Sequence, residues 1–387
     1  MSDWQVRIVN DIRELDRAQW DALVGEESPF LEWDWLASLE EADCVRPDRG
    51  WAPHHLAVES GGRLIAACPL YLKGHSEGEF VFDHEWAYAA DNAGIAYYPK
   101  LLVAVPFTPA NGIRFLTAPG QPRAELIRVL GEVLKHIAEQ NELSSVHVNF
   151  CRPDEVAVLR ELGFLERVGM QYHWENRGYG SFEDYLGAFR SKRRTKIRHE
   201  RKEMAAQGVT IRALTGDAIP DALVPTFYRL YKDHIDKLYW GRLYLTPRFF
   251  ELAAQRFRRN LCFVAAERDG EVIAGTFNVQ KHGVFYGRYW GAFEEVPFLH
   301  FNVCYYAAIE HCIEQGLQRM EPGAGGDFKQ LRGFDPRPTR SMHYFTNPAM
   351  GDAVARHLER ERARMGLVID HLNEQSQLKP EAHQGGD

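Results

Sequence analysis

One short sequence pattern occurs twice in this chain, at residues 57–67 and again at 265–275. The two segments align without a gap and share alanine, glutamate, glycine and isoleucine at matching positions. Each predicts a strand, a tight turn and a second strand, with Gly62 and Gly270 where a hairpin turn requires a positive φ. The two copies lie too far apart for the unit of a solenoid. The repeat therefore predicts two copies of one domain.

The same order of elements is expected after both hairpins. In the first half, periodicity predicts a strand, a helix, a strand, a helix and a strand, at 101–105, 123–140, 145–150, up to 162 and up to 174. In the second half the matching elements fall at 284–290, 300–315, 317–321, up to 332 and up to 344. His173 and His343 occupy equivalent last strands. The fold class that follows is α/β (α+β), with mixed sheets flanked by helices.

Composition excludes several classes of function. A net charge of −8 disfavours a general binder of DNA or of anionic membranes. The six cysteines form no CxxC pair, which is typical of reduced thiols in a cytoplasmic protein. We expect no metal site, since no Cys/His spacing suits one. We also expect no secretory signal and no membrane span, because no apolar run is long enough.

Ordered stretches in both halves resemble a known family. They lie at residues 28–31, 82–87, 97–101, 105–109, 192–201, 300–306, 321–324, 329 and 332–334. Over nearly its full length the chain is similar to the FemAB-like family of predicted N-acyltransferases, whose halves are GNAT-type acyl-CoA N-acyltransferase folds. Two positions depart from the family pattern: Phe328 stands where a histidine is common, and Asn302 where a glutamate is common.

The repeat and the resemblance together predict the domain plan. Residues 1–180 are expected to form an N-terminal GNAT-like domain. Residues 181–350 are expected to form a C-terminal one that begins with a basic linker helix. Residues 351–387 are expected to form a helix followed by a flexible tail, because apolar side chains recur at helical spacing and the last residues are polar.

The resemblance implies a cytoplasmic, bacterial-type transferase that moves an acyl group from an acyl-CoA thioester to an amine of a small molecule or a cell-wall precursor. Acyl-CoA would be a co-substrate, with no permanently bound cofactor. One alternative is a FemABX-type transferase that takes an aminoacyl group from tRNA to a peptidoglycan precursor. A second alternative is a non-catalytic, metabolite-binding GNAT-like protein. The absence of the usual Gln/Arg-x-x-Gly-x-Gly/Ala loop favours this binder. The oligomeric state is left open.

The first candidate site is the run Asp83, His84 and Glu85. N-acyl transfer requires a proton acceptor near the amine, and a histidine or a buried carboxylate can serve. The run would then be a loop that supplies the base. The competing interpretation is a helix start with Asp83 at the N-cap. The resemblance also implies that Trp86, Tyr98 and Lys100 bind substrate or cofactor.

The second candidate is Glu321, at the end of a predicted strand and before the glycine-rich stretch 322–326. Glycines after a strand let the backbone approach a ligand closely. Glu321 is then the base or the anchor of the amine, while Lys329 and Arg332 hold an anionic group. The competing interpretation is a mobile turn followed by a solvated helix.

Histidines and one basic run complete the set. His300 precedes a predicted helix, where an anion would also bind. His343 and His173 lie on strands and are more typical of half-buried structural residues. Residues 190–202 are rich in lysine and arginine, and Arg193 and Arg194 are candidates for phosphate contacts. The competing interpretation is a solvated helix in which Glu200 pairs with Lys196.

Overall fold

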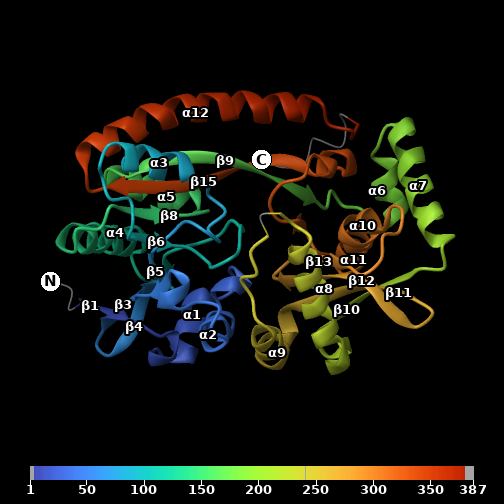
Figure 1. Cartoon of the computed structure of the whole chain (residues 1–387), viewed down its shortest axis with the longest axis horizontal. Helices are drawn as coiled ribbons and strands as arrows, with labels where there is room; N and C mark the ends of the chain where they lie inside the picture. Colours follow the sequence, from blue (N-terminus) through green and yellow to red (C-terminus); the bar gives the residue numbers. More distant parts are fainter. Residues whose placement is uncertain (1–3, 240, 380–387) are drawn as a thin grey trace. The chain divides into compact units, whose positions relative to one another are not determined.

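The computed structural model describes residues 4–239 and 241–379, which form two compact units (Figure 1). Unit 1 comprises the described residues up to 170 together with 338–368, and unit 2 comprises those of 171–337 together with 369–379. The chain enters unit 2 within strand β9 (Leu165–Glu175) and leaves it within β15 (Asp335–Phe345). Helix α12 (Pro348–Glu374) then begins in unit 1 and ends in unit 2.

Unit 1 contains two sets of paired strands. The first is a sheet in the order β1-β3-β4-β7, formed by β1 (Trp4–Val9), β3 (His55–Ser60), β4 (Arg63–Cys68) and β7 (Leu116–Thr117). The second runs in the order β2-β5-β6-β8-β15, with β2 (Trp51–Pro53), β5 (Leu70–Lys73), β6 (Lys100–Val103) and β8 (Ser145–Val148). Strands β6 and β8 are parallel, whereas the other neighbours in this set are antiparallel.

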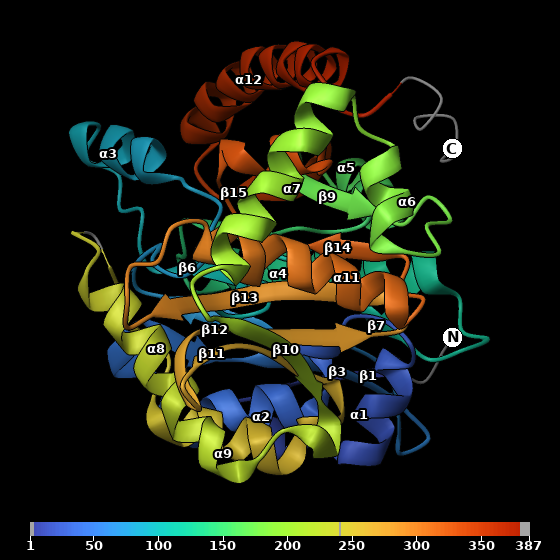
Figure 2. The same ribbon diagram turned by 90° about the vertical axis from the view of Figure 1, so that its right-hand side faces the viewer.

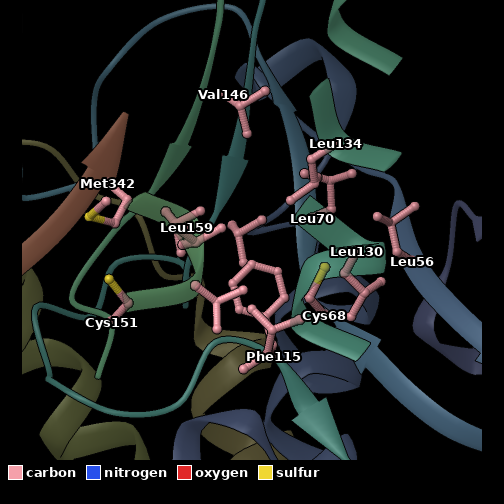
Figure 3. Close-up of a cluster of buried hydrophobic side chains, with 14 of the residues drawn as sticks. Leu56, Cys68, Leu70, Phe115, Leu130, Leu134, Val146, Cys151, Leu159 and Met342 are labelled. Atoms are coloured by element: carbon pink, nitrogen blue, oxygen red, sulfur yellow. The ribbon is translucent and has the colours of Figure 1, made fainter. Parts of the chain in front are cut away.

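The helices of unit 1 cover these strands and close its core. They are α1 (Arg17–Val24), α2 (Trp33–Glu41), α3 (His84–Asn92), α4 (Arg123–Gln140), α5 (Pro153–Glu161) and the first part of α12. Leucines one turn apart on α4, at 126, 130 and 134, are fully buried, as an apolar stripe at helical spacing predicts. Figure 3 shows two of them in one cluster with Leu70 and Val146 of the strands.

Unit 2 is built on one mixed set of strands. Its order is β10-β11-β12-β13-β14-β9, with β10 (Thr210–Thr215), β11 (Leu261–Arg268), β12 (Glu271–Lys281), β13 (Val284–Ala292) and β14 (Arg319–Glu321). Only the pair β13–β14 is parallel among these neighbours in the described residues. The helix between those two strands is the crossover that a parallel pair requires.

Helices lie on both sides of the strands of unit 2. Figure 2 shows α8 (Val224–Asp236) and α9 (Pro247–Arg256) on one side, and α11 (Ala307–Glu314) on the other. Helices α6 (Phe182–Gly187) and α7 (Ser191–Ala205) precede β10. The predicted helix at 300–315 is present, but it contains a π-helical segment, Asn302–Tyr306, between α10 (Leu299–Phe301) and α11. The prediction of one uninterrupted α-helix is therefore wrong at that segment.

The predicted internal repeat is confirmed in detail. Both hairpins form, and Gly62 and Gly270 have φ of +74° and +83°. Each hairpin also carries a register shift at the same aligned place, between Val58 and Glu59 in one copy and between Ala266 and Glu267 in the other. A bulge bends its strand and is a specific feature of a fold. Its repetition shows that the two units share one architecture.

None of the helices in the described residues combines the length and the apolar character needed to cross a lipid bilayer.

Candidate active site

A cavity of about 280 Å³ opens in unit 2 beside the centre of its sheet. Strands β12 and β13 form one wall, the π-helical segment and α10 form a second, and the loop after β14 forms a third. Aromatic and cationic side chains dominate its lining. The main lining residues are Asn278, Arg288, Tyr289, Trp290, His300, Cys304, Tyr305, Phe328 and Lys329.

The glycine-rich loop 322–326 is held in place by Lys329. Gly323, Gly325 and Gly326 all have positive φ, which explains why glycines stand there. Lys329 follows on the 3-10 helix η8 (Asp327–Arg332), and its Nζ donates to the carbonyl oxygens of Gly323 at 2.6 Å and Ala324 at 3.2 Å. An ammonium has three N–H bonds, and the third makes no hydrogen bond among the described residues.

Burial changes the acidity of the Lys329 ammonium. Its side chain is only 3 % exposed, and no carboxylate forms a salt bridge with it in the described part of the chain. Burial disfavours the charged form and lowers the pKa of Lys329 to about 8. Lys329 is therefore still mainly a cation at neutral pH, in a site where its charge is weakly screened by water.

His300 lies on α10 and faces the same cavity. Its ring packs edge-on against Trp290 and Tyr305, with ring centroids 5.1 and 5.5 Å apart. Burial and nearby cations, Arg332 first among them, lower the pKa of His300 to about 4. The imidazole is consequently neutral at pH 7 and has a nitrogen that can accept a proton.

Glu321 ends β14 as predicted, but it does not line the cavity. Its carboxylate is 3 % exposed, and lies 3.1 Å from Nη2 of Arg319 and 3.9 Å from Nε2 of His173. Burial, reinforced by Arg319 and other cations, lowers the pKa of His173 to about 3, so that ring is neutral. The structure places Glu321 in a buried polar group behind the glycine-rich loop.

Arg332 is bound by other groups of the protein. The Arg332 guanidinium is 1 % exposed, donates to Glu200 at 2.8 Å and to the Phe328 carbonyl at 2.9 Å, and stacks on the Phe301 ring at 3.5 Å. The competing prediction for this region, a Glu200–Lys196 pair, is wrong because Glu200 turns inward to Arg332.

Arg193 and Arg194 differ in their surroundings. Arg193 is buried and its Nε donates to the carbonyl of Leu331. Arg194 is half-buried, and no hydrogen bond or salt bridge involves its side chain among the described residues. Of the two, only Arg194 has a guanidinium that a ligand could reach without breaking an existing bond.

The first candidate run, Asp83 to Glu85, lies in unit 1, and its side chains face different surroundings. Asp83 occupies the N-cap position of α3, so the helix-start interpretation holds and the loop interpretation is wrong. Its side chain does not cap the helix. It accepts instead from Lys100 at 2.5 Å and from Tyr97 at 2.6 Å, inside a cluster that also holds Glu79 at 2.9 Å from Lys100.

Lys100 has no exposed surface, and this buried ion cluster accounts for its charge. Tyr98 lies beside the cluster and its hydroxyl contacts Ser76 at 2.8 Å. His84, Glu85 and Trp86 line a different surface, a groove between α3 and α12.

His343, one of the two strand histidines, has structural surroundings, as predicted. His343 is fully buried and its Nδ1 lies 2.6 Å from Nδ1 of His147. Trp86 packs edge-on against it at 4.9 Å. Burial holds the pKa of both histidines of this pair well below the usual value, so one neutral ring donates to the other.

Comparison with known proteins assigns the family. A model of the FemAB-like family, described as peptidoglycan biosynthesis/recognition, matches residues 11–380. The chain belongs to the FemAB-like family. This confirms the resemblance and supports a transferase that acts in peptidoglycan-related processes. A comparison with curated protein sequences gives no match.

Solved structures of similar fold agree with the family. FemX is 13 % identical, with 88 % of this chain and 98 % of FemX covered at a TM-score of 0.55. The L-PGS structure from Bacillus licheniformis is 11 % identical, covering 91 % and 98 % at 0.54. The C-terminal domain (DUF2156) of a putative lysylphosphatidylglycerol synthetase from Agrobacterium fabrum is 12 % identical, covering 90 % and 97 % at 0.56. Together with the repeated architecture, these likenesses confirm the tandem GNAT-like fold.

The two positions that depart from the FemAB-like pattern have distinct places. Phe328 lines the cavity with a side chain that is 57 % exposed. Asn302 is buried in the π-helical segment and its amide donates to the carbonyls of Glu200 and Phe298, at 3.2 and 2.9 Å. Asn302 therefore ties that segment to α7 and does not face the cavity.

Several cavity residues were not among the predicted site residues. Trp290, Cys304 and Tyr305 line the cavity, and Cys304 stands four residues after His300, on the same side of a helix. That spacing was a usable signal. Trp290 offered none, because an aromatic side chain near a strand end is usually a core residue.

Proposed function

We propose that this chain transfers an acyl group from an activated thioester or ester to an amine in the cavity of unit 2. The observation that carries the proposal is Lys329, a buried cation with one uncommitted N–H bond, beside the neutral imidazole of His300. A preorganised donor and a proton acceptor in one cavity are what this reaction needs.

The proposed reaction is a direct transfer. The free N–H of Lys329 binds the carbonyl oxygen of the donor, and stabilises the negative charge that develops there as the amine attacks. His300 takes the proton from the attacking nitrogen. The carbonyl then re-forms, the bond from carbon to the leaving sulfur or oxygen breaks, and the leaving group takes up the proton.

A covalent cysteine intermediate does not suit this cavity. Cys304 is the lining thiol, and burial raises the pKa of that thiol well above its usual value. The thiolate is the nucleophilic form of cysteine, so a thiol with a raised pKa is inert at neutral pH. Direct attack by the amine is the route that the lining residues support.

We propose acyl-CoA as the donor and an amine of a small molecule or cell-wall precursor as the acceptor. The cavity is about 280 Å³, which suits a short acyl chain together with the amine end of an acceptor. The description of the family as peptidoglycan biosynthesis/recognition supports a cell-wall precursor.

An aminoacyl-tRNA donor is the second candidate, because α7 presents a set of exposed cations. Three of its basic side chains are exposed and form no salt bridge in residues 4–239 and 241–379, namely Lys192, Lys196 and Lys202, and the same holds for Arg190 at its N-cap. Phosphates bind such a row with a strong dependence on salt. Turnover with aminoacyl-tRNA that falls with salt and with charge removal on α7 would select this candidate.

The test is a donor screen by mass spectrometry. Purified protein is incubated with acyl-CoA thioesters or with aminoacyl-tRNA, each with pooled amines that include peptidoglycan precursors. The proposal predicts a new amide product that the double variant His300→Ala, Lys329→Met does not form. A donor that raises the melting temperature of the protein without any product would identify a metabolite-binding protein instead.

A further inference from the structure

A second groove lies within unit 1, between α3 and α12, and has no part in the proposed transfer. Its volume is about 610 Å³. Three elements line it: the start of α3, strand β9 and the middle of α12. The lining residues are Phe82, His84, Glu85, Trp86, Arg167, His357, Arg360, Glu361 and Arg364.

Arg167 forms a rigid floor for this groove. Its Nε and Nη2 donate to the two carboxylate oxygens of Glu361 at 3.0 and 2.8 Å, and its Nη1 donates to the Phe82 carbonyl at 2.7 Å. The guanidinium also stacks on the Trp86 ring at 4.8 Å. Because a guanidinium has five N–H bonds, two remain after these three contacts. Arg167 is thus held in one orientation, and two of its N–H bonds make no hydrogen bond among the described residues.

The remaining charge of the groove is positive. Arg167 and Glu361 neutralise each other. The other charged residues are one carboxylate, Glu85, and two arginines, Arg360 and Arg364. The two arginines lie one turn apart on α12, so their side chains share one face of the helix. Among the described residues, no carboxylate forms a salt bridge with either of them. Two unpaired guanidinium groups beside a fixed third one are suited to a phosphate.

An exposed aromatic pair borders the cationic face. The Phe82 side chain is 68 % exposed, and its ring lies 6.2 Å from that of His84 at an angle of 33°. Single exposed apolar side chains are common on protein surfaces, and what distinguishes Phe82 is its place in the lining of this groove, together with the arginines. A planar or sugar ring attached to the phosphate would pack there.

We propose that this groove binds the phosphate or diphosphate of a ligand that also carries a ring. Arg360, Arg364 and the free N–H bonds of Arg167 hold the phosphate, and Phe82 with His84 packs against the ring. The same phosphate chemistry is found in a soluble nucleotide and in a phospholipid headgroup.

The test measures binding to the full chain by titration calorimetry, with inorganic pyrophosphate and with ADP as probes. A parallel arm measures sedimentation with phosphatidylglycerol vesicles, using phosphatidylcholine vesicles for comparison. Arg360→Gln and Arg364→Gln remove exposed side chains and should leave the fold intact. Arg356→Gln is the matched control, since Arg356 is an exposed arginine of α12 that does not line the groove.

Each groove variant is expected to weaken binding of pyrophosphate about tenfold, the size of one charge-assisted hydrogen bond, while Arg356→Gln leaves it unchanged. Phe82→Ser should weaken ADP and not pyrophosphate. Binding to phosphatidylglycerol vesicles alone, with the same dependence on Arg360 and Arg364, would assign the phosphate to a lipid. Absence of binding in both arms, or binding that the two variants do not change, would overturn the proposal.

Discussion

The burial of Lys329 gives the proposed reaction a defined pH range. The ammonium is the form that stabilises the developing charge, and it loses its proton as the pH rises through about 8. The rate of the wild type is therefore expected to fall above that pH, because the neutral Lys329 amine no longer stabilises the developing charge. Lys329→Arg keeps a cation at higher pH, and its pH–rate profile should extend further into the alkaline range. An alkaline limb at the same pH in both proteins would argue against this role.

Glu321 provides a second test at the residue scale, because its burial predicts a structural role. Its carboxylate lies against Arg319 and His173 and behind the cavity wall. Glu321→Gln should lower the free energy of unfolding by about 2–3 kcal/mol while turnover falls less than tenfold. Urea unfolding and steady-state kinetics measure the two effects, with Glu314→Gln, an exposed carboxylate on α11, as the control. A rate loss of about a thousandfold in a stable Glu321→Gln protein would make Glu321 the base.

Individual site residues could be predicted only in part. His300 and Lys329 were predicted as binding residues and do line the cavity; their roles stay predictions. Glu321 was predicted as the base or the anchor of the amine from its place at a strand end before glycines, but it does not line the cavity. The sequence does not reveal whether such a side chain faces the cavity or the interior. That choice is made by packing between segments distant in the chain.

At the scale of elements, the ion cluster between α3 and β6 contributes to stability. Burial by itself would raise the pKa of Asp83, but the charge of the Lys100 ammonium and the hydrogen bonds to the carboxylate together outweigh burial and hold that pKa well below its ordinary value of 3.8. Since the folded pKa is the lower one, the ionised Asp83 stabilises the fold at neutral pH. That contribution is complete above about pH 5 and is lost as the pH falls further.

Asp83→Asn should therefore lower the free energy of unfolding by about 3–5 kcal/mol at pH 7, because Lys100 loses a buried partner. At pH 3 the difference between variant and wild type should shrink. Urea denaturation at both pH values measures this, with Asp91→Asn on the exposed side of α3 as the control. An equal difference at both pH values would contradict the role assigned to the charge.

Elements with a strong period were predictable, and others were not. Helix α4 was predicted with its observed bounds because its leucines recur at helical spacing. The π-helical segment at 302–306 was missed, since one wider turn hardly alters the apolar pattern of a helix. Helix α3 was left as one of two interpretations, because its side chains give few helix signals.

At the scale of the whole molecule, the path of the chain makes unit 1 depend on distant segments. Residues 342–345 of β15 pair with β8, and Met350, Val354 and Leu358 of α12 share one buried cluster with Trp86 of α3. A chain that ends at residue 337 lacks all of these. Its β8 amides should lose their protection from hydrogen exchange, whereas a chain that ends at residue 368 should keep it. Equal protection in the two truncated chains would contradict this dependence.

The duplicated architecture was predictable and the discontinuous units were not. The aligned hairpins with Gly62 and Gly270 were enough to indicate two copies of one fold. The return of residues 338–368 to unit 1 depends on which strand edge receives β15. Alternating apolar residues show which face of a strand is buried, but they do not determine which strand pairs with it.

The most direct test of the proposed transfer is its single-turnover rate constant in Lys329→Met, once the screen has supplied a donor and an acceptor. Lys135→Met in unit 1 is the matched control, because Lys135 also donates to a backbone carbonyl, that of Leu162 at 3.1 Å. Loss of one oxyanion donor predicts a fall of about 10²–10³ in Lys329→Met and no change in Lys135→Met. A Lys329→Met rate within a few-fold of the wild type, in a protein that still binds the donor, would contradict transfer in this cavity.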